Sequence, residues 1–515
     1  MPTSSYLRAL SRRGFLAGIP ALAVAIGARA AGSKGGALKE PTAVAGNYAD
    51  LSAVEAVARM RAGDLSAERY AEALLARCKA GESLNAFITL EPAQVLEAAR
   101  AADQRRAAGA HLGLLHGLPV PIKDSINTRE YRTTGGTPAL REFRPALNAP
   151  IVEQLVRAGA IVLGKTNLHE LSFGWTSNNL AYGAVHNPYD PTRIPGGSSG
   201  GTGAAIAARM APLGVAEDTE GSIRVPAALC GVKGFRPTTR RYSTEGAVPI
   251  SALFDQVGPH ARAVGDLVLF DQVATGEHAP IAPLPLRGVR LAVGRAYWFA
   301  GLDPDVERLT EEALAKLRAA GAEIVEAEVP ELASLIALVT DQVQSHDVRT
   351  DLPKYLQRYG VKASFEQVVA EASADIRAVF AHDVLPGGPG FVSEAVYRAA
   401  VDVHLPRLRE IFRRYFRETG AAAIVFPATR VAAPLIGASE VTIGGQQVTV
   451  DDAVSRNIAS GSTVGLPGLV LPVGLTPAGL PVALEFDGPA GGDRALLGLG
   501  LTLERVLGDL PPPRV

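Results

Sequence analysis

Cysteine is almost absent from this chain, which has only Cys78 and Cys230 among its 515 residues. Their scarcity excludes a disulfide scaffold and a cysteine-rich zinc site. Neither charge sign is in excess, because 51 Lys and Arg residues stand against 52 Asp and Glu, a formal net charge of −1. The chain therefore lacks the excess of basic residues that is typical of nucleic-acid-binding proteins. No uncharged apolar run is long enough to span a bilayer, so no stable membrane anchor is expected.

The overall composition is that of a globular protein, with 47% hydrophobic, 20% charged and 6% aromatic residues. Apolar periodicity is helical over residues 51–106 and 304–320. Candidate buried strands lie at residues 118–122, 160–163, 289–293, 323–325, 422–426 and 469–473. Strands that alternate with helices predict an α/β fold with a largely covered sheet. We expect residues 51–515 to form one domain, with a mostly helical insertion at about 331–415 that caps a site.

The N-terminus has the features of an export signal. Arg12 and Arg13 precede an uncharged stretch that ends at Gly27, and a small-x-small pattern follows at residues 28–30. This order resembles a twin-arginine (Tat) signal peptide, whereas an ordinary disordered tail is the alternative. We expect residues 1–30 to be the signal and the mature bacterial protein to be periplasmic or secreted. The two cysteines can then pair in principle, although isolated cysteines in apolar surroundings are usually free buried thiols.

Residues 31–50 are rich in Gly, Ala and Lys and are expected to form a flexible leader.

Beyond residue 50, three segments place lysine, serine and glycine where a simple core needs none. The first runs from Gly117 to Ser125, and its strand ends at Lys123. A desolvated lysine favours the neutral amine, which can act as a base. The alternative is a lysine that reaches the surface from the strand end.

The second segment is Pro195–Gly203, which contains Ser198 and Ser199 among five glycines. Glycines allow close approach of the backbone to a ligand. The match to a Gly-x-Ser-x-Gly nucleophile elbow is weak, because no buried strand precedes it. The segment also lacks the lysine of a phosphate-binding loop.

The third segment begins at Asp218, and its Ser222 follows a tight polar turn and precedes an apolar helical stretch. Backbone N–H groups of such a turn can converge on one oxygen, as in an oxyanion hole. The alternative for a single serine in this place is a helix cap.

Together and in this order, the three segments resemble the amidase signature family. The resemblance extends over about residues 50–507 and is densest from 117 to 237, and residues 465–468 and 479–481 also fit the family's pattern. It implies the α/β amidase signature fold, a large mixed β-sheet covered on both faces by helices. It also implies that the protein hydrolyses a small-molecule amide with water and uses neither a cofactor nor a metal. Members of the family can form homodimers, so the resemblance allows a homodimer here.

The resemblance implies a role for each motif. Ser222 is the acyl-forming nucleophile, Ser198 is a bridging serine after a cis peptide bond, and Lys123 is the terminal base, so that an acyl-enzyme forms. The expected oxyanion and substrate-binding residues are Thr219, Glu220, Gly221 and Ser222, and the expected supporting residues are Ser199, Asp218 and Arg224.

The sequence departs from the family's usual Gly-x-Asp-x-Gly-Gly-Ser pattern at two positions. Glu217 stands where a small polar residue is common, and Glu220 stands where a glycine is common. A glutamate in place of a glycine that needs positive φ is strained, and a carboxylate near a developing oxyanion is unfavourable. Either Glu220 faces outward and only its N–H matters, or the two carboxylates weaken catalysis or select a cationic or polar substrate.

Residues 164–203 are similar to bacterial mandelamide and indoleacetamide hydrolases, which suggests small primary amides of arylacetic acids. Phe173 and Trp175 are candidates for the acyl pocket, although each can equally be a core residue. A further aromatic cluster, residues 297–299, is expected to contribute from the next strand.

Other functions remain open at this point. The same triad serves amidases and esterases that act on peptide amides, N-acyl amines, anilides or carbamates. The family also includes a subunit of the tRNA-dependent amidotransferase, against which the export signal argues. An inactive homologue used as a binding protein is a further alternative because of Glu220, although the retained triad argues against it. A zinc hydrolase is disfavoured, because His169-Glu170 lacks the second histidine of a zinc helix.

Overall fold

The computed structural model describes residues 47–514. The predicted export signal and leader residues 31–46 lie outside the described part of the chain. Tyr48–Asp50 form a short 3₁₀-helix in which Ala49 is buried, so the end of the predicted leader belongs to the folded domain. The described residues lie within one compact unit.

A mixed sheet of eleven strands forms the centre of the domain, in the order β1-β3-β2-β6-β8-β7-β14-β15-β11-β9-β10. Strand β2 is parallel to β3 and β6, β9 is parallel to β10 and β11, and the remaining neighbours are antiparallel. The strands are β1 (Phe87–Leu90), β2 (Pro119–Lys123), β3 (Ile161–Thr166), β6 (Leu213–Asp218), β7 (Lys233–Arg236), β8 (Gln256–Ala261), β9 (Arg290–Val293), β10 (Glu323–Glu326), β11 (Ala423–Pro427), β14 (Gly468–Leu475) and β15 (Pro481–Asp487). The prediction of an α/β fold with a large mixed sheet is confirmed.

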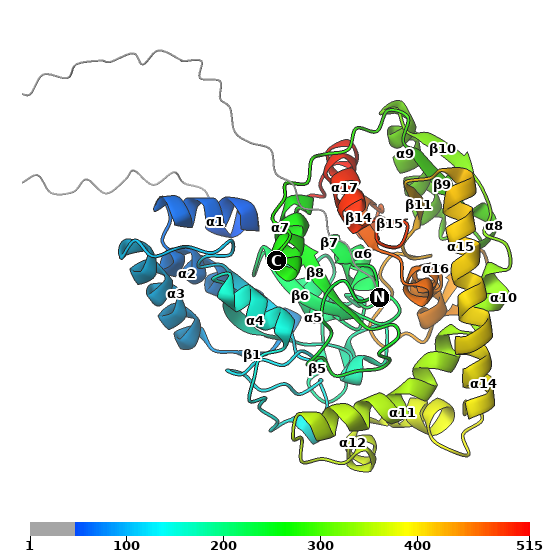
Figure 1. Cartoon of the computed structure of the whole chain (residues 1–515), viewed down its shortest axis with the longest axis horizontal. Helices are drawn as coiled ribbons and strands as arrows, with labels where there is room; N and C mark the ends of the chain where they lie inside the picture. Colours follow the sequence, from blue (N-terminus) through cyan, green and yellow to red (C-terminus); the bar gives the residue numbers. More distant parts are fainter. Residues whose placement is uncertain (1–46, 515) are drawn as a thin grey trace, which may run out of the picture. The chain divides into compact units, whose positions relative to one another are not determined.

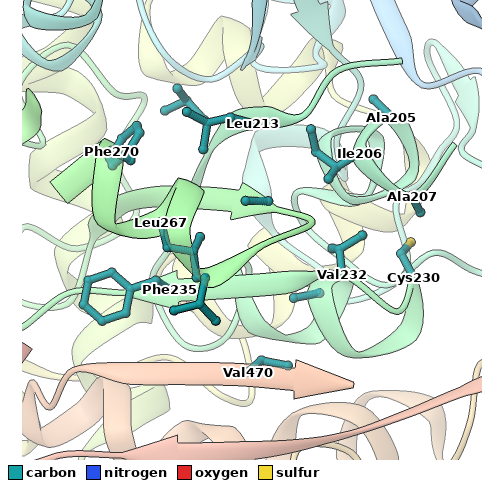
Figure 2. Packing of buried hydrophobic residues seen from close by; sticks show 14 of the residues in the cluster. Ala205, Ile206, Ala207, Leu213, Cys230, Val232, Phe235, Leu267, Phe270 and Val470 are labelled. Atoms are coloured by element: carbon teal, nitrogen blue, oxygen red, sulfur yellow. The ribbon is translucent and has the colours of Figure 1, made fainter. Parts of the chain in front are cut away.

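Helices cover both faces of the sheet. Gly214 of β6 lies against Ile206 of α5 (Gly200–Ala207), and Gly234 of β7 lies against α6 (Arg224–Leu229) on the same face. On the opposite face, Leu469 of β14 packs against α17 (Asp493–Leu507), which contacts α7 (Val264–Thr275). Figure 2 shows this core, in which the side chains of α5 and α7 meet the central strands between them. Further helices are α8 (Arg295–Trp298), α9 (Pro304–Ala319) and α16 (Val450–Val464).

The N-terminal part is helical with one interruption. Helices α1 (Ala53–Ala62), α2 (Ala67–Ala80) and α3 (Pro92–Ala107) occupy the region predicted as continuous helix, but the edge strand β1 separates α2 from α3. The prediction was wrong there: β1 is a strand of four residues, all of them only partly buried, between two helical stretches, so it lacks the pattern of a buried strand. Helix α4 (Pro150–Arg157) then precedes β3, and two small hairpins complete the chain: β4 (Asn178–Asn179) with β5 (Gly183–Ala184), and β12 (Glu440–Ile443) with β13 (Gln446–Thr449).

Residues 332–419 form a run of helices between β10 and β11. They are α10 (Leu332–Ala337), α11 (Thr340–Arg358), α12 (Phe365–Glu371), α13 (Ala374–Val379), α14 (Glu394–Ala399) and α15 (Leu405–Thr419), with π-helical turns at Phe380–Val384 and Ala400–His404. Figure 1 shows α14 and α15 on the side of the domain opposite to α1–α3. Within residues 47–514, no helix combines the length and the apolar character that crossing a membrane requires.

The two cysteines are free thiols in the interior. Cys78 lies on α2 and Cys230 follows α6, and both are buried. Burial raises the pKa of the Cys78 thiol to about 12 and also raises the pKa of the Cys230 thiol. Neither thiol is therefore a reactive thiolate at neutral pH.

Candidate active site

The candidate site lies at the carboxyl ends of three neighbouring parallel strands of the sheet. Strands β3, β2 and β6 run in the same direction, and Lys123 is the last residue of β2. Glu217 and Asp218 are the last two residues of β6. Because the carboxyl ends of neighbouring parallel strands meet at one edge, these side chains converge there, in the place where α/β sheets commonly bind ligands.

The Lys123 side chain is completely buried and has two polar partners. Its Nζ lies 2.6 Å from Oγ of Ser198 and 2.7 Å from Oε1 of Glu217. The lysine does not reach the surface, so the alternative of a solvated strand end does not apply. Burial lowers the pKa of Lys123, and the neighbouring Glu217 carboxyl opposes that effect.

The loop that carries Ser198 is fixed by its backbone. The peptide bond between Gly197 and Ser198 is cis. A Cβ at Gly197 would lie 2.6 Å from the carbonyl carbon of Trp175, so only glycine allows this approach. Ser199 donates from Oγ to the carbonyl oxygen of Glu217 at 3.1 Å, which ties the loop to the end of β6.

Ser222 lies in the turn between β6 and α6 and lines the adjacent pocket. Its hydroxyl makes no hydrogen bond to Ser198, nor to any other group within residues 47–514. The N–H groups of the four predicted oxyanion residues, Thr219 to Ser222, likewise donate to no group of the described chain. The turn therefore presents unused donors beside a serine hydroxyl, which is the arrangement that can stabilise an oxyanion.

A buried ion network supports this turn from behind. Asp218 accepts hydrogen bonds from the backbone N–H of Ile223 and from Nε of Arg224, at 3.0 and 3.1 Å. Nε of Arg236 lies 3.2 Å from the same carboxylate. Burial alone would raise the pKa of Asp218, but the two guanidinium groups outweigh it and lower the pKa. Arg224 also contacts Glu485, Ser462 and the carbonyl oxygens of Ile458 and Glu220.

A pocket of about 530 Å³ opens beside Ser222. Phe173 and Trp175, the predicted acyl-pocket residues, both line it. Tyr297 lines it as well, but from helix α8 and not from a strand as predicted. Trp298 lies instead in the core, stacked on Phe426 at 5.1 Å between ring centroids. Only the first residue of that aromatic cluster therefore reaches the pocket.

Acidic side chains predominate among the charged residues of the pocket wall. They are Glu220, Asp341, Asp383, Asp451 and Asp452, against one basic residue, Arg456. The Arg456 guanidinium donates to the carbonyl oxygens of Tyr297 and Ala300. Residues of the helical segment 332–419, among them Asp341 and Asp383, form part of this wall.

Glu220 neither strains the backbone nor faces away from the pocket. Its φ is not in the left-handed region, so the expected strain is absent. Its carboxyl group lies on the pocket wall and accepts a hydrogen bond from Nε2 of Gln344, on α11, at 2.6 Å. Burial and the nearby Asp341 carboxylate raise the pKa of Glu220 to about 8. The hydrogen-bonded carboxyl is therefore largely protonated at neutral pH, which reduces its conflict with an oxyanion.

Sequence reasoning missed three residues of this site. Ser172 donates to Glu217, Asp255 accepts a hydrogen bond from Oγ1 of Thr219 at 2.7 Å, and Gln344 holds Glu220. None of the three lies in the segments 117–125, 195–203 or 218–222 that carry the predicted catalytic residues, and each comes from a segment distant in sequence from its partner. Local patterning carries no signal for such contacts.

The amidase family profile matches this chain from residue 69 to residue 497. The chain belongs to the amidase family. It is 39% identical over 457 residues to the indoleacetamide hydrolase of Agrobacterium vitis, an alignment that covers 88% of this chain and 97% of that protein. It is 36% identical over 477 residues to the mandelamide hydrolase of Pseudomonas putida, covering 90% and 93% of the two chains.

Among solved structures, a crystal structure of an amidase superposes with a TM-score of 0.80 at 30% identity, covering 89% of this chain and all of that one. The predicted amidase fold is thereby confirmed. This amidase is an enzyme that hydrolyses amide C–N bonds, as the resemblance implied.

Proposed function

We propose that this amidase hydrolyses a small primary amide of an arylacetic acid to the carboxylate and ammonia, through an acyl-enzyme on Ser222. The observation that carries the proposal is the buried contact of 2.6 Å between Nζ of Lys123 and Oγ of Ser198, beside the pocket that Ser222 lines. A serine hydroxyl is a weak nucleophile and needs a base within reach. In this chain the available base is a lysine whose pKa burial has lowered.

The proposed reaction begins with proton transfer along the two serines. Neutral Lys123 takes the proton of Ser198 as Ser198 takes that of Ser222, and Oγ of Ser222 attacks the carbonyl carbon of the amide. The contact between the two serines forms with substrate in place, since catalytic hydrogen bonds are often incomplete in the free enzyme. The same groups return the proton to the departing ammonia, and water then hydrolyses the acyl-enzyme.

The turn at residues 219–222 is the proposed oxyanion hole. Its unused N–H groups suit the negative oxygen of the tetrahedral intermediate. One such donor is typically worth about 3–4 kcal/mol of transition-state stabilisation. Asp218 and Arg224 act on this step only by fixing the turn.

The pocket supports an aryl-bearing acyl group. Its three aromatic side chains, Phe173, Trp175 and Tyr297, offer ring faces and edges to a planar group. Its volume of about 530 Å³ suits a small ligand. Relatives named for indoleacetamide and for mandelamide have the same general substrate type.

Ammonia release by residues 31–515 tests the proposal. The panel contains phenylacetamide, mandelamide, indole-3-acetamide, a peptide amide, an anilide and an ester, with the last two followed by their own leaving groups. We expect release from an arylacetamide that disappears in Ser222→Ala. If only the peptide amide, the anilide or the ester is hydrolysed, the assignment of an arylacetamide substrate is wrong and that compound class takes its place. If no compound on the panel is hydrolysed, the result would favour the alternative that the chain is an inactive homologue used as a binding protein.

We also propose that the amidase is exported to the periplasm. The support is the Arg12-Arg13 pair and the cleavage pattern that ends at Ala30. Fractionation of cells that produce the full chain should place the activity in the periplasm, and Arg12→Lys combined with Arg13→Lys should retain it in the cytoplasm. Equal distribution of both forms would contradict export by this route.

A further inference from the structure

Glu217 occupies an unusual position for a carboxylate, because it shares the proposed catalytic base with Ser198. Its side chain is buried near the end of β6. Its Oε1 accepts a hydrogen bond from Nζ of Lys123 at 2.7 Å, while the same nitrogen lies 2.6 Å from Oγ of Ser198. The lysine nitrogen is therefore held between the carboxylate on one side and the serine on the other.

The same carboxylate oxygen has a second donor that reaches the pocket. Oγ of Ser172 donates to Oε1 of Glu217 at 2.5 Å, and Ser172 lines the pocket together with Ser222. The polar network around Lys123 thus meets the pocket through Ser172, whereas the hydroxyl of Ser222 lines the same pocket without a hydrogen bond to the network. Glu217 is the link between Ser172 and the lysine.

We propose that Glu217 is a positioning residue for Lys123: it holds the lysine nitrogen against Ser198 and sets the proton affinity of that nitrogen. The inference rests on the proposed function, in which neutral Lys123 is the base. A negative charge at this distance inside a protein favours the protonated, charged form of a lysine. Glu217 therefore favours ammonium over amine and shifts the onset of activity to higher pH.

The other ionisable groups that act on Lys123 do not account for such an effect. They are Asp218, Asp255, His169 and His260. Burial lowers the pKa of both histidines to about 4, so they are neutral through the working range. Asp218 is neutralised by its arginines, and burial together with Glu217 raises the pKa of Asp255 well above its usual value. Glu217 is the acidic group in direct contact with the lysine.

The test measures the pH dependence of Ser222 phosphonylation by a fluorophosphonate, which needs the same base but no knowledge of the natural amide. Activity rises with pH as Lys123 loses its proton. Glu217→Gln removes the charge with little change in shape, so this rise should move to lower pH by about one to three units. Glu217→Thr, which removes the charge with a smaller side chain, should move it in the same direction and replaces the first variant if that one does not fold.

Ser172→Ala is the matched control, because it removes the other contact of the carboxylate and leaves the charge. Its pH profile should not move to lower pH. An unmoved profile in both Glu217 variants, or an equal downward shift in Ser172→Ala, would overturn the inference. Absence of any label on Ser222 in the unaltered protein would instead overturn the proposed function, so the two failures are distinguishable.

Discussion

Lys123 and Ser198 are 75 residues apart in the chain, yet Nζ of the lysine lies 2.6 Å from Oγ of the serine in a fully buried contact. The lysine comes from the end of β2 and the serine from the loop before α5. A base and a hydroxyl at hydrogen-bond distance, next to a pocket, are the elements of an activated nucleophile. The first prediction concerns this pair.

Lys123→Met should lower kcat by about 10²–10⁴-fold, the usual contribution of a general base, with little change in KM. The apolar side chain fills similar volume but accepts no proton. Ser198→Ala should lower kcat to a similar extent, because it interrupts the same proton path. Steady-state kinetics on the best substrate of the panel provide the measurement. A loss confined to KM would indicate that the pair only shapes the pocket.

The second prediction concerns the pH dependence of Glu220. Its pKa of about 8 implies a neutral carboxyl group below that pH and a carboxylate beside the oxyanion turn above it. We expect kcat/KM to fall above about pH 8, since the carboxylate repels the oxyanion. Glu220→Gln keeps the contact with Gln344 and should abolish this fall. An alkaline fall that persists in the variant would assign it to another group.

The same titration affects stability. The pKa of Glu220 is raised in the folded state from the ordinary 4.5 to about 8, so the folded chain binds more protons between these values. The free energy of unfolding therefore decreases as pH rises through this window. Urea unfolding at pH 5 and pH 8.5 should show a smaller decrease for Glu220→Gln than for the unaltered protein.

The third prediction concerns the buried network behind the turn. Arg224→Met should lower the free energy of unfolding by about 3–5 kcal/mol, because it leaves Glu485 buried without its guanidinium partner and Asp218 with only one of its two, Arg236. Arg308→Met is the control, since Arg308 forms solvent-exposed ion pairs with Asp305 and Glu312, and exposed pairs contribute little to stability. Equal urea midpoints for the two variants would contradict a special role for the network.

The fourth prediction concerns substrate charge. The acidic wall of the pocket, apart from the largely protonated Glu220, should disfavour an anionic acyl group, because its carboxylates repel a further negative charge. Between two arylacetamides of similar size, one with a para aminomethyl group and one with a para carboxylate, kcat/KM should be at least about tenfold higher for the cation, equivalent to 1.4 kcal/mol. The ratio should shrink as salt is added. A higher kcat/KM for the anion would mean that the positive charge of Arg456, and not the acidic residues, determines the charge preference of the pocket.

Much of the site was predictable because its residues lie in short ordered motifs. Lys123, Ser198 and Ser222 each belong to such a motif, and the structure brings the first two into contact. Strands β2, β3, β11 and β14 were visible as apolar runs, which are typical of buried strands.

What sequence reasoning missed depends on contacts between distant segments. Strand β6 carries Glu217 and Asp218, but its acidic end does not match the apolar pattern of a buried strand. The effect of Glu220 depends on Gln344, which lies 124 residues away on α11. Neither the position of β6 nor the contact of Glu220 with Gln344 follows from local periodicity. The direction of the Glu220 side chain therefore could not be predicted from the sequence and became clear only from the structure.

The measurement that tests the central claim most directly is the location of the covalent adduct. The protein is treated with a fluorophosphonate, digested and mapped by mass spectrometry, with Ser222→Ala treated in parallel. The account predicts one adduct per chain, on Ser222, and none in the variant. An adduct on Ser172, Ser198 or Ser199, or labelling that persists in Ser222→Ala, would contradict it.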